Sequence, residues 1–167
     1  MSKGDTFVGR RAFLTGAAGL AAVATGGLLA GCGKKGTPDG PVAITSSDTC
    51  ARCGMLISDM RYAAEIVGTE HVWKFDDPGE MFAYYHEQHI AANEVKAMYV
   101  DDFRTKTWLP AKSAHFVVNR TQFQTPMGSG VAAFADAAAV QQYTASGSGV
   151  ARSYEQLLAE PPLLRPM

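Results

Sequence analysis

The stretch DDPGEMFAYYHEQHI, residues 76–90, contains a strong helix-start signal. The acidic pair Asp76-Asp77 suits a helix cap, Pro78 suits the first turn, and Glu80 adds a negative charge near the positive end of the helix dipole. The apolar positions that follow share roughly one face of such a helix: Met81, Phe82, Tyr85 and Ile90. We therefore expect a helix with one buried face.

Strand signals surround this helix. Short β-rich runs predict strands at residues 61–67, 71–75, 94–100, 106–109, 115–119 and 147–151, with turns at 68–70 and 101–105. Helical patterns predict a second helix at 131–144 and a terminal helical turn or two at 153–160. The order strand, strand, helix, strand thus occurs twice. It predicts a single α+β domain with antiparallel sheet, built from two ββαβ units.

The N-terminal 31 residues have the pattern of a bacterial export signal. Arg10 and Arg11 precede an apolar run, residues 12–30, that is rich in Ala and Gly rather than Leu or Ile, which favours a signal over a transmembrane helix. The arginine pair resembles a twin-arginine signal, with an ordinary secretory route as the alternative. LAGC at residues 29–32 resembles a lipobox, in which Cys32 is acylated and becomes the mature N-terminus.

These patterns divide the chain into four parts. We expect a signal peptide at 1–31, the lipidated cysteine and a flexible tether at 32–41, a domain at 42–160 and a C-terminal tail at 161–167. Removing residues 1–31 takes away three of the 15 Lys and Arg residues and one of the 16 Asp and Glu residues, leaving 12 against 15 and a net charge near −3. No nucleic-acid partner is expected from this balance.

The stretch DTCARCGM, residues 48–55, carries the remaining two cysteines, Cys50 and Cys53. Their spacing suits a catalytic disulfide, a structural disulfide or half of a zinc site. No helix start follows Cys53, although a thioredoxin-like pair needs one to lower the thiol pKa. Zinc needs four ligands, and the nearest completion is His86 and His89, three residues apart on the expected helix.

Methionines favour a softer metal. Thiolate and thioether sulfur suit Cu(I), and Met55 shares one side with Cys53 if this stretch is extended. Met127 lies in the turn sequence TPMGSG, residues 125–130, where a core methionine is less expected. Met55 could instead be ordinary core filler, and the turn that carries Met127 could simply join a strand to a helix.

Several motifs in this order resemble the NosL family of copper-binding lipoproteins, which are associated with nitrous-oxide reductase maturation. The motifs are the lipoprotein signal, DTCARCGM at 48–55, FDDPG at 75–79, VDDF at 100–103 before Trp108, and TPMG at 125–128 followed by AF at 133–134. The resemblance spans residues 46–143, which is most of the mature domain.

The resemblance implies a periplasmic, membrane-anchored Cu(I) carrier that delivers copper to the apo reductase, with a fold of paired ββαβ units. By position, its copper ligands are Cys53, Met55 and Met127, and Cys50 matches the family's first cysteine as a further ligand or a redox partner. His71 and His115 are candidates for an additional nitrogen ligand. We expect transfer by ligand exchange, with Met127 on a mobile loop leaving first.

Two other classes of function stay open. One is a lipid-anchored thiol-disulfide oxidoreductase that uses Cys50 and Cys53, and the other is a structural zinc module. No Ser/His/Asp signature, phosphate loop or nucleotide motif is present, so we expect a carrier rather than an enzyme. The Asp76-Asp77 and Asp101-Asp102 pairs are expected to cap a helix and form a turn. The large aromatics are expected in the core or on edge strands: Trp73, Trp108, Phe116, Phe134 and Tyr143.

Overall fold

The computed structural model describes residues 37–145, 147–162 and 164. The expected signal peptide, the lipobox with Cys32, and part of the tail lie outside these residues. No helix within the described ranges is long and apolar enough to cross a membrane.

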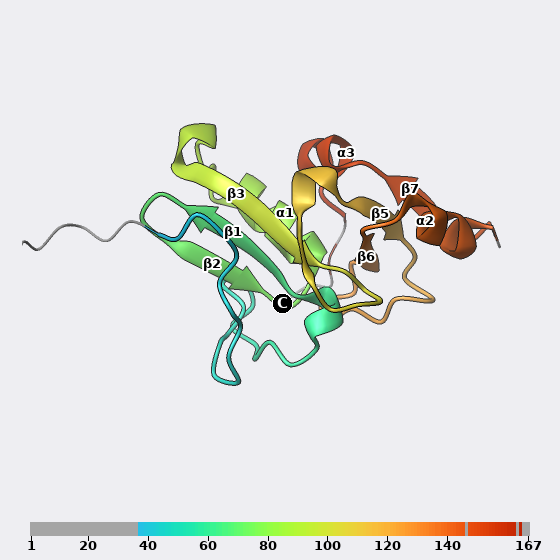
Figure 1. Cartoon of the computed structure of the whole chain (residues 1–167), viewed down its shortest axis with the longest axis horizontal. Helices are drawn as coiled ribbons and strands as arrows, with labels where there is room; N and C mark the ends of the chain where they lie inside the picture. Colours follow the sequence, from blue (N-terminus) through green and yellow to red (C-terminus); the bar gives the residue numbers. More distant parts are fainter. Residues whose placement is uncertain (1–36, 146, 163, 165–167) are drawn as a thin grey trace, which may run out of the picture. The chain divides into compact units, whose positions relative to one another are not determined.

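The first sheet has four antiparallel strands in the order β2-β1-β3-β4. Their bounds are Ala64–Gly68 (β1), Val72–Phe75 (β2), Val95–Asp101 (β3) and Trp108–Pro110 (β4). Helix α1, Pro78–Glu87, connects β2 to β3 and packs on β1 and β2. In Figure 1 this helix lies behind the sheet.

The second sheet has three antiparallel strands in the order β6-β5-β7. Its elements are His115–Val118 (β5), Val131–Phe134 (β6), Ala137–Thr144 (α2) and Val150–Arg152 (β7), followed by Tyr154–Ala159 (α3). Short 3-10 helices occupy Met60–Tyr62, Ala92–Glu94 and Ala111–Ser113. A parallel bridge between Asp102 and Ala133 connects the two sheets.

The α+β fold with two ββαβ units is confirmed, but the second unit uses other strands than expected. In both units the first strand lies in the centre, with the second and third strands on either side. The strand expected near 106–109 is β4, which joins the first sheet instead of starting the second unit. The second unit therefore consists of β5, β6, α2 and β7.

The expected helix at 131–144 is wrong over its first residues. Residues 131–134 form β6, which is buried along its whole length and pairs with β5. Helix α2 begins only at Ala137, because the side chain of Asp136 caps it by accepting from the Ala138 amide at 2.8 Å. The alanine-rich composition suggested a longer helix, and the pairing partner in β5 overrides that local preference.

Two apolar clusters form the core. The larger lies between the first sheet, α1, α3 and the second sheet, and includes Phe75, Phe82 and Phe116. The smaller is aromatic: Tyr62, Phe103, Phe123, Phe134 and Tyr143. Trp73 and Trp108 lie on the edge strands β2 and β4, as expected for these residues.

The segment before β1 lies across the other face of the first sheet. The amide of Val42 donates to Glu65 at 2.8 Å, and Lys74 pairs with Asp48 at 2.7 Å. Nearer the N-terminus, Lys96 on β3 donates to the Thr37 carbonyl at 2.6 Å and pairs with Asp39 at 3.1 Å. The described part of the expected tether thus contacts the sheet.

This face of the sheet buries two carboxylates, Glu65 and Asp101. Glu65 is 0% exposed and Asp101 is 1% exposed. Glu65 Oε2 and both carboxylate oxygens of Asp101 have no hydrogen-bond partner within the described residues. The pKa of each group is raised to about 7, by burial in both cases and, for Asp101, also by the neighbouring Asp102 carboxylate. Lys74 acts in the opposite direction on Glu65.

The raised pKa values predict a protein that loses stability between about pH 4, where the unfolded chain loses these protons, and about pH 7, where the folded protein does. A carboxyl with a folded-state pKa near 7 keeps its proton in the folded state after the unfolded chain has lost it. The stabilisation present at low pH therefore disappears as pH rises through 7. Asp101→Asn cannot ionise, so its free energy of unfolding should fall less than that of the wild type, by about 1 kcal/mol or more.

Urea unfolding at pH 5.5 and 8.5 measures this difference. The matched control is Asp136→Asn, at the exposed cap of α2, which should keep the wild-type pH dependence. An Asp101→Asn variant with the same slope as the wild type would show that Asp101 is ionised in the folded protein.

Candidate metal-binding site

The cysteine motif forms a tight loop rather than an extended strand. Thr49 and Leu56 make an antiparallel bridge, and inside it the Cys50 amide donates to the Met55 carbonyl at 2.8 Å. Gly54 has φ of +75°, a left-handed conformation that favours glycine. The expectation that Cys53 and Met55 share one side of an extended stretch is therefore wrong.

The loop attaches to the end of β2. The amide of Ala51 donates to the Lys74 carbonyl at 2.8 Å, which brings both cysteines next to the junction between β2 and α1. No helix starts after Cys53, as expected, and the next element is the 3-10 helix Met60–Tyr62.

Four potential ligand groups converge at this junction: the thiols of Cys50 and Cys53 and the carboxylates of Asp76 and Glu80. One ligand atom from each residue lies within 4.8 Å of the corresponding atoms of the others. Asp76 precedes the N-cap of α1, and Glu80 lies in the first turn of that helix. The site thus combines the cysteine loop with the N-terminus of one helix.

Each thiol contacts one carboxylate. Cys50 Sγ donates to Glu80 Oε2 at 2.7 Å, and Cys53 Sγ lies 3.7 Å from Asp76 Oδ1. Both cysteines are free thiols in this structure. Cys50, Asp76 and Glu80 are buried, whereas Cys53 is partly accessible. Cys53 is therefore the sulfur that an incoming ion or partner reaches first.

Arg52 balances part of the negative charge. Its Nη1 pairs with buried Glu80 at 3.2 Å, and its Nη2 pairs with Glu87 at 2.8 Å. The Arg52 Nε also donates to Glu87 at 2.9 Å, so the guanidinium binds this carboxylate through two nitrogens. Arg52 thereby holds the cysteine loop on α1.

The metal-free site favours protonated thiols. Burial raises the pKa of Cys50 far above its usual value, and burial raises the pKa of Cys53 to about 11. Burial, together with neighbouring Glu80, raises the pKa of Asp76 to about 6. These shifts are opposite to the lowered thiol pKa of reactive redox cysteines.

The structure places the other candidate ligands as follows. Met127 is 7% exposed and lies outside both apolar clusters of the described residues, whereas Met55 is 42% exposed. His71 and His115 are exposed on the first and second halves of the fold and are not among the four convergent groups.

The histidine pair expected for a zinc site does not join the cysteines. His86 and His89 are exposed, and His86 Nε2 lies 2.6 Å from the Leu158 carbonyl, so this ring connects α1 to α3. The four convergent groups contain neither histidine. The structure therefore does not bring together the Cys and His side chains that the predicted zinc site requires.

Sequence reasoning missed Asp76, Glu80 and Arg52. The Asp76-Asp77 pair was expected to cap the helix, and only Asp77 does so, by accepting from the Gly79 amide at 2.8 Å. Glu80 lies in the first turn of α1, as expected, but its contact with Cys50 was not expected. In the sequence, the burial of Glu80 could have been suggested only by its position. It lies three residues after the cap and on the same face of the helix as buried Ala83.

Comparison with known proteins agrees with this fold. The NosL family model matches residues 41–160. A curated relative, the copper-binding lipoprotein NosL of Stutzerimonas stutzeri, is 32% identical over 133 residues, covering 72% of this chain and 69% of the relative. The crystal structure of the copper chaperone NosL from Shewanella denitrificans aligns with a TM-score of 0.59 at 21% identity, covering 71% of this chain and 96% of the other.

Fold and site define a small α+β protein with a thiol-rich, partly buried candidate metal site. The chain belongs to the NosL family, as its motifs suggested.

The Arg52–Glu80 pair makes a prediction about metal-free stability. Arg52→Met leaves the fully buried Glu80 carboxylate without its cation, so we expect a loss of about 2 to 3 kcal/mol in the free energy of unfolding. Chemical denaturation of the reduced, metal-free protein measures it. Lys96→Met, which breaks the exposed pair with Asp39, should cost less than about 1 kcal/mol. Equal losses would contradict a special role for Arg52.

Proposed function

We propose that this protein is an exported, membrane-anchored Cu(I) metallochaperone that delivers copper to a copper enzyme. The convergence of Cys50 and Cys53 on the N-terminus of α1 carries this proposal, because it is an incomplete, sulfur-containing site at a partly accessible position. Membership of a family whose relatives are named copper-binding lipoprotein and copper chaperone supports it.

The proposed copper ligands are Cys53, Met127 and Met55, with Cys50 as a further thiol. Thiolate and thioether are soft, polarizable ligands that suit Cu(I). The place of Met127 in the TPMG stretch, one of the motifs by which the chain resembles the NosL family, supports its role. Exposed Met55 lies at the opening of the same loop, where a partner could replace it.

The neighbouring carboxylates have a proposed role in proton transfer. Formation of a copper–sulfur bond at a protonated thiol releases one proton. Glu80 already accepts the hydrogen of Cys50, and Asp76 lies beside Cys53, so each thiol has an acceptor at its side. When the carboxylate passes the proton of one thiol on to solvent, one proton is exchanged for one copper ion of equal charge, and the net charge of the site does not change.

Delivery would proceed by ligand exchange. A site with two or three sulfur ligands keeps a position open for a ligand from the acceptor. Because the Met127 turn is hydrogen-bonded to buried groups, we propose that the side chain of Met127 rotates away rather than that its loop moves. Methionine has three rotatable side-chain bonds, which permits such a change.

A thiol-disulfide oxidoreductase remains the second candidate, because two free thiols lie close together. It requires a functional disulfide between Cys50 and Cys53 and no contribution from Met127. The copper chaperone, in contrast, requires Met127 as a ligand, so a substitution of Met127 distinguishes the two functions.

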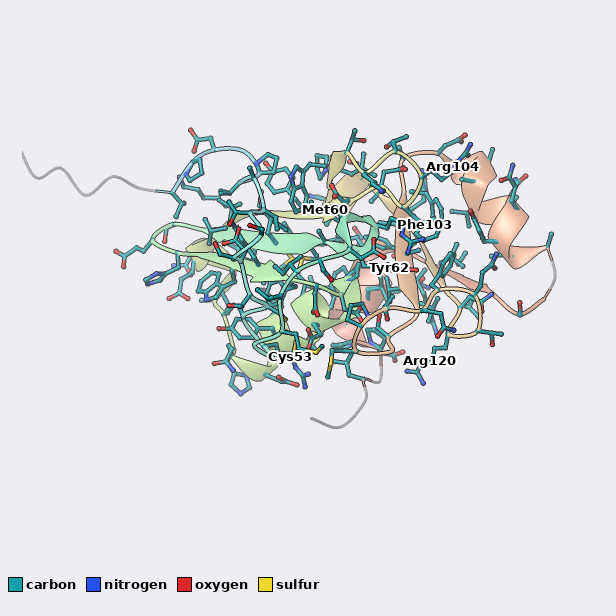
Figure 2. All side chains as sticks on the ribbon, turned by 90° about the horizontal axis from the view of Figure 1, so that it is seen from below. Cys53, Met60, Tyr62, Phe103, Arg104 and Arg120 are labelled. Carbon is teal, nitrogen blue, oxygen red and sulfur yellow. The ribbon has the colours of Figure 1, made fainter. Side chains whose placement is uncertain are left out.

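An anaerobic Cu(I) titration against a competing chromophoric chelator tests the copper site. Met127→Leu keeps the volume of the side chain but removes the thioether, and it should weaken binding by about tenfold, which corresponds to about 1.4 kcal/mol. Cys53→Ser should weaken binding at least as much. The control is Met60→Leu, a substitution of the same type at a residue that lies well away from Cys53 in Figure 2.

Wild-type affinity in both Met127→Leu and Cys53→Ser would exclude the proposed site. Affinity that depends on Cys53 and Cys50 but not on Met127, with a measurable disulfide potential, would favour the oxidoreductase. Unfolding of the protein by a metal chelator, together with a dependence of its stability on His86 and His89, would instead favour the structural zinc module.

The anchor and the acceptor make a separate prediction. We propose that Cys32 carries the lipid and that the acceptor is apo nitrous-oxide reductase or its maturation machinery. In a nitrous-oxide-respiring host, Cys32→Ser should move the protein from the membrane to the soluble periplasmic fraction. Deletion of the gene should lower the copper content of the purified reductase, and Met127→Leu should restore it less than the wild type does. A fully metallated reductase in the deletion strain would point to another acceptor.

A further inference from the structure

Asp77 joins the start of α1 to the turn that carries Met127. Its carboxylate is 0% exposed. Oδ1 accepts from the Gly79 amide at 2.8 Å and from the Ser129 hydroxyl, and Oδ2 accepts from the Ser129 amide at 3.2 Å. One buried side chain therefore caps the helix and binds the turn at the same time.

The turn itself is closed by its own polar side chains. The amide of Gly128 donates to the Thr125 carbonyl at 3.0 Å, and the amide of Gly130 donates to the Thr125 hydroxyl at 3.0 Å. The Val131 amide donates to the Ser129 hydroxyl at 3.1 Å. Met127 lies between Thr125 and Ser129, so its backbone is held from both sides.

The helix and the turn are in direct contact at Gly79. A Cβ atom placed on Gly79 would lie 2.3 Å from the Cβ of Ser129, which no packing arrangement allows. Glycine at this position lets the first turn of α1 approach Ser129 closely enough for the Asp77 bonds to form.

Adjacent residues thus serve the two halves of the site. Asp76 lies beside Cys53, and Asp77 binds the turn of Met127. Because Asp76 and Asp77 are consecutive residues, the start of α1 fixes the position of the Met127 turn relative to the cysteine loop.

We propose that Asp77, acting through Ser129, is a positioning residue that places Met127 against Cys53 so that both sulfurs reach one copper ion. This inference rests on the proposed copper function and extends it. It assigns to Asp77 a role beyond helix capping, and to Ser129 a role beyond closing its turn.

A double-mutant cycle separates this role from a merely structural one. Ser129→Ala removes the hydroxyl that binds Asp77 but leaves the Gly79 cap bond intact. In the full chain, kept reduced and anaerobic, Ser129→Ala should weaken Cu(I) binding by about fivefold or more. In a Met127→Leu background the same substitution should cause no further loss, because the thioether it positions is already absent.

Ser153→Ala is the matched control. It removes the serine cap of α3, a site of the same chemistry, and should leave the Cu(I) affinity unchanged in both backgrounds. Asp77→Asn is a second variant: it keeps an oxygen to cap Gly79 but replaces one acceptor of the Ser129 amide with a donor. It should weaken binding only when Met127 is present.

X-ray absorption at the copper edge gives a readout that stability alone does not change. The copper-loaded wild type should show more sulfur neighbours than Ser129→Ala or Asp77→Asn. Equal losses of affinity in the wild-type and Met127→Leu backgrounds, or an unchanged sulfur count, would overturn the positioning role. If Met127→Leu itself has no effect on affinity, the proposed copper site fails instead, and the two failures are thus distinguishable.

Discussion

Three carboxylates buried at the start of α1 hold the candidate site together. Asp76 lies beside Cys53, Asp77 binds Ser129, and Glu80 binds Cys50 and Arg52. Buried carboxylates are costly unless they have partners, so we expect loss of the partners of Asp77 or Glu80 to destabilise the protein. The two segments that supply the candidate sulfur ligands, the cysteine loop and the turn that carries Met127, are therefore both bound to the first turn of α1.

The charge at this helix start explains why the site can exist without metal and still accept a cation. The N-terminus of a helix stabilises negative charge, and Arg52 compensates for one carboxylate. The raised pKa values of both cysteines keep their thiols protonated and uncharged in the metal-free site. Under the proposed function, copper replaces protons that the site already holds, so loading requires no new buried charge.

Much of the fold follows from local signals, and the exceptions have a common cause. The Asp77 cap with Pro78 predicts α1, and the β1–β2 hairpin and α3 also agree with their sequence patterns. Residues 131–134 form a strand because β5 offers a pairing edge, which an alanine-rich sequence does not reveal. Likewise, Gly54 adopts a left-handed conformation between Cys53 and Met55. The alternation of side chains in an extended strand, on which the sequence argument was based, does not predict this turn.

The sequence by itself determined the cap of α1 and the strands and helix of the first unit, because these depend on residue type and on neighbours within a few positions. Its resemblance to the NosL family also pointed to Cys53 and Met127. Only the tertiary structure decided that Asp76, rather than its neighbour, lies beside a thiol, and that Glu80 and Arg52 belong to the same cluster. The physical reason is that burial and pairing of these charges depend on the cysteine loop folding onto α1, a contact between segments that are distant in the sequence.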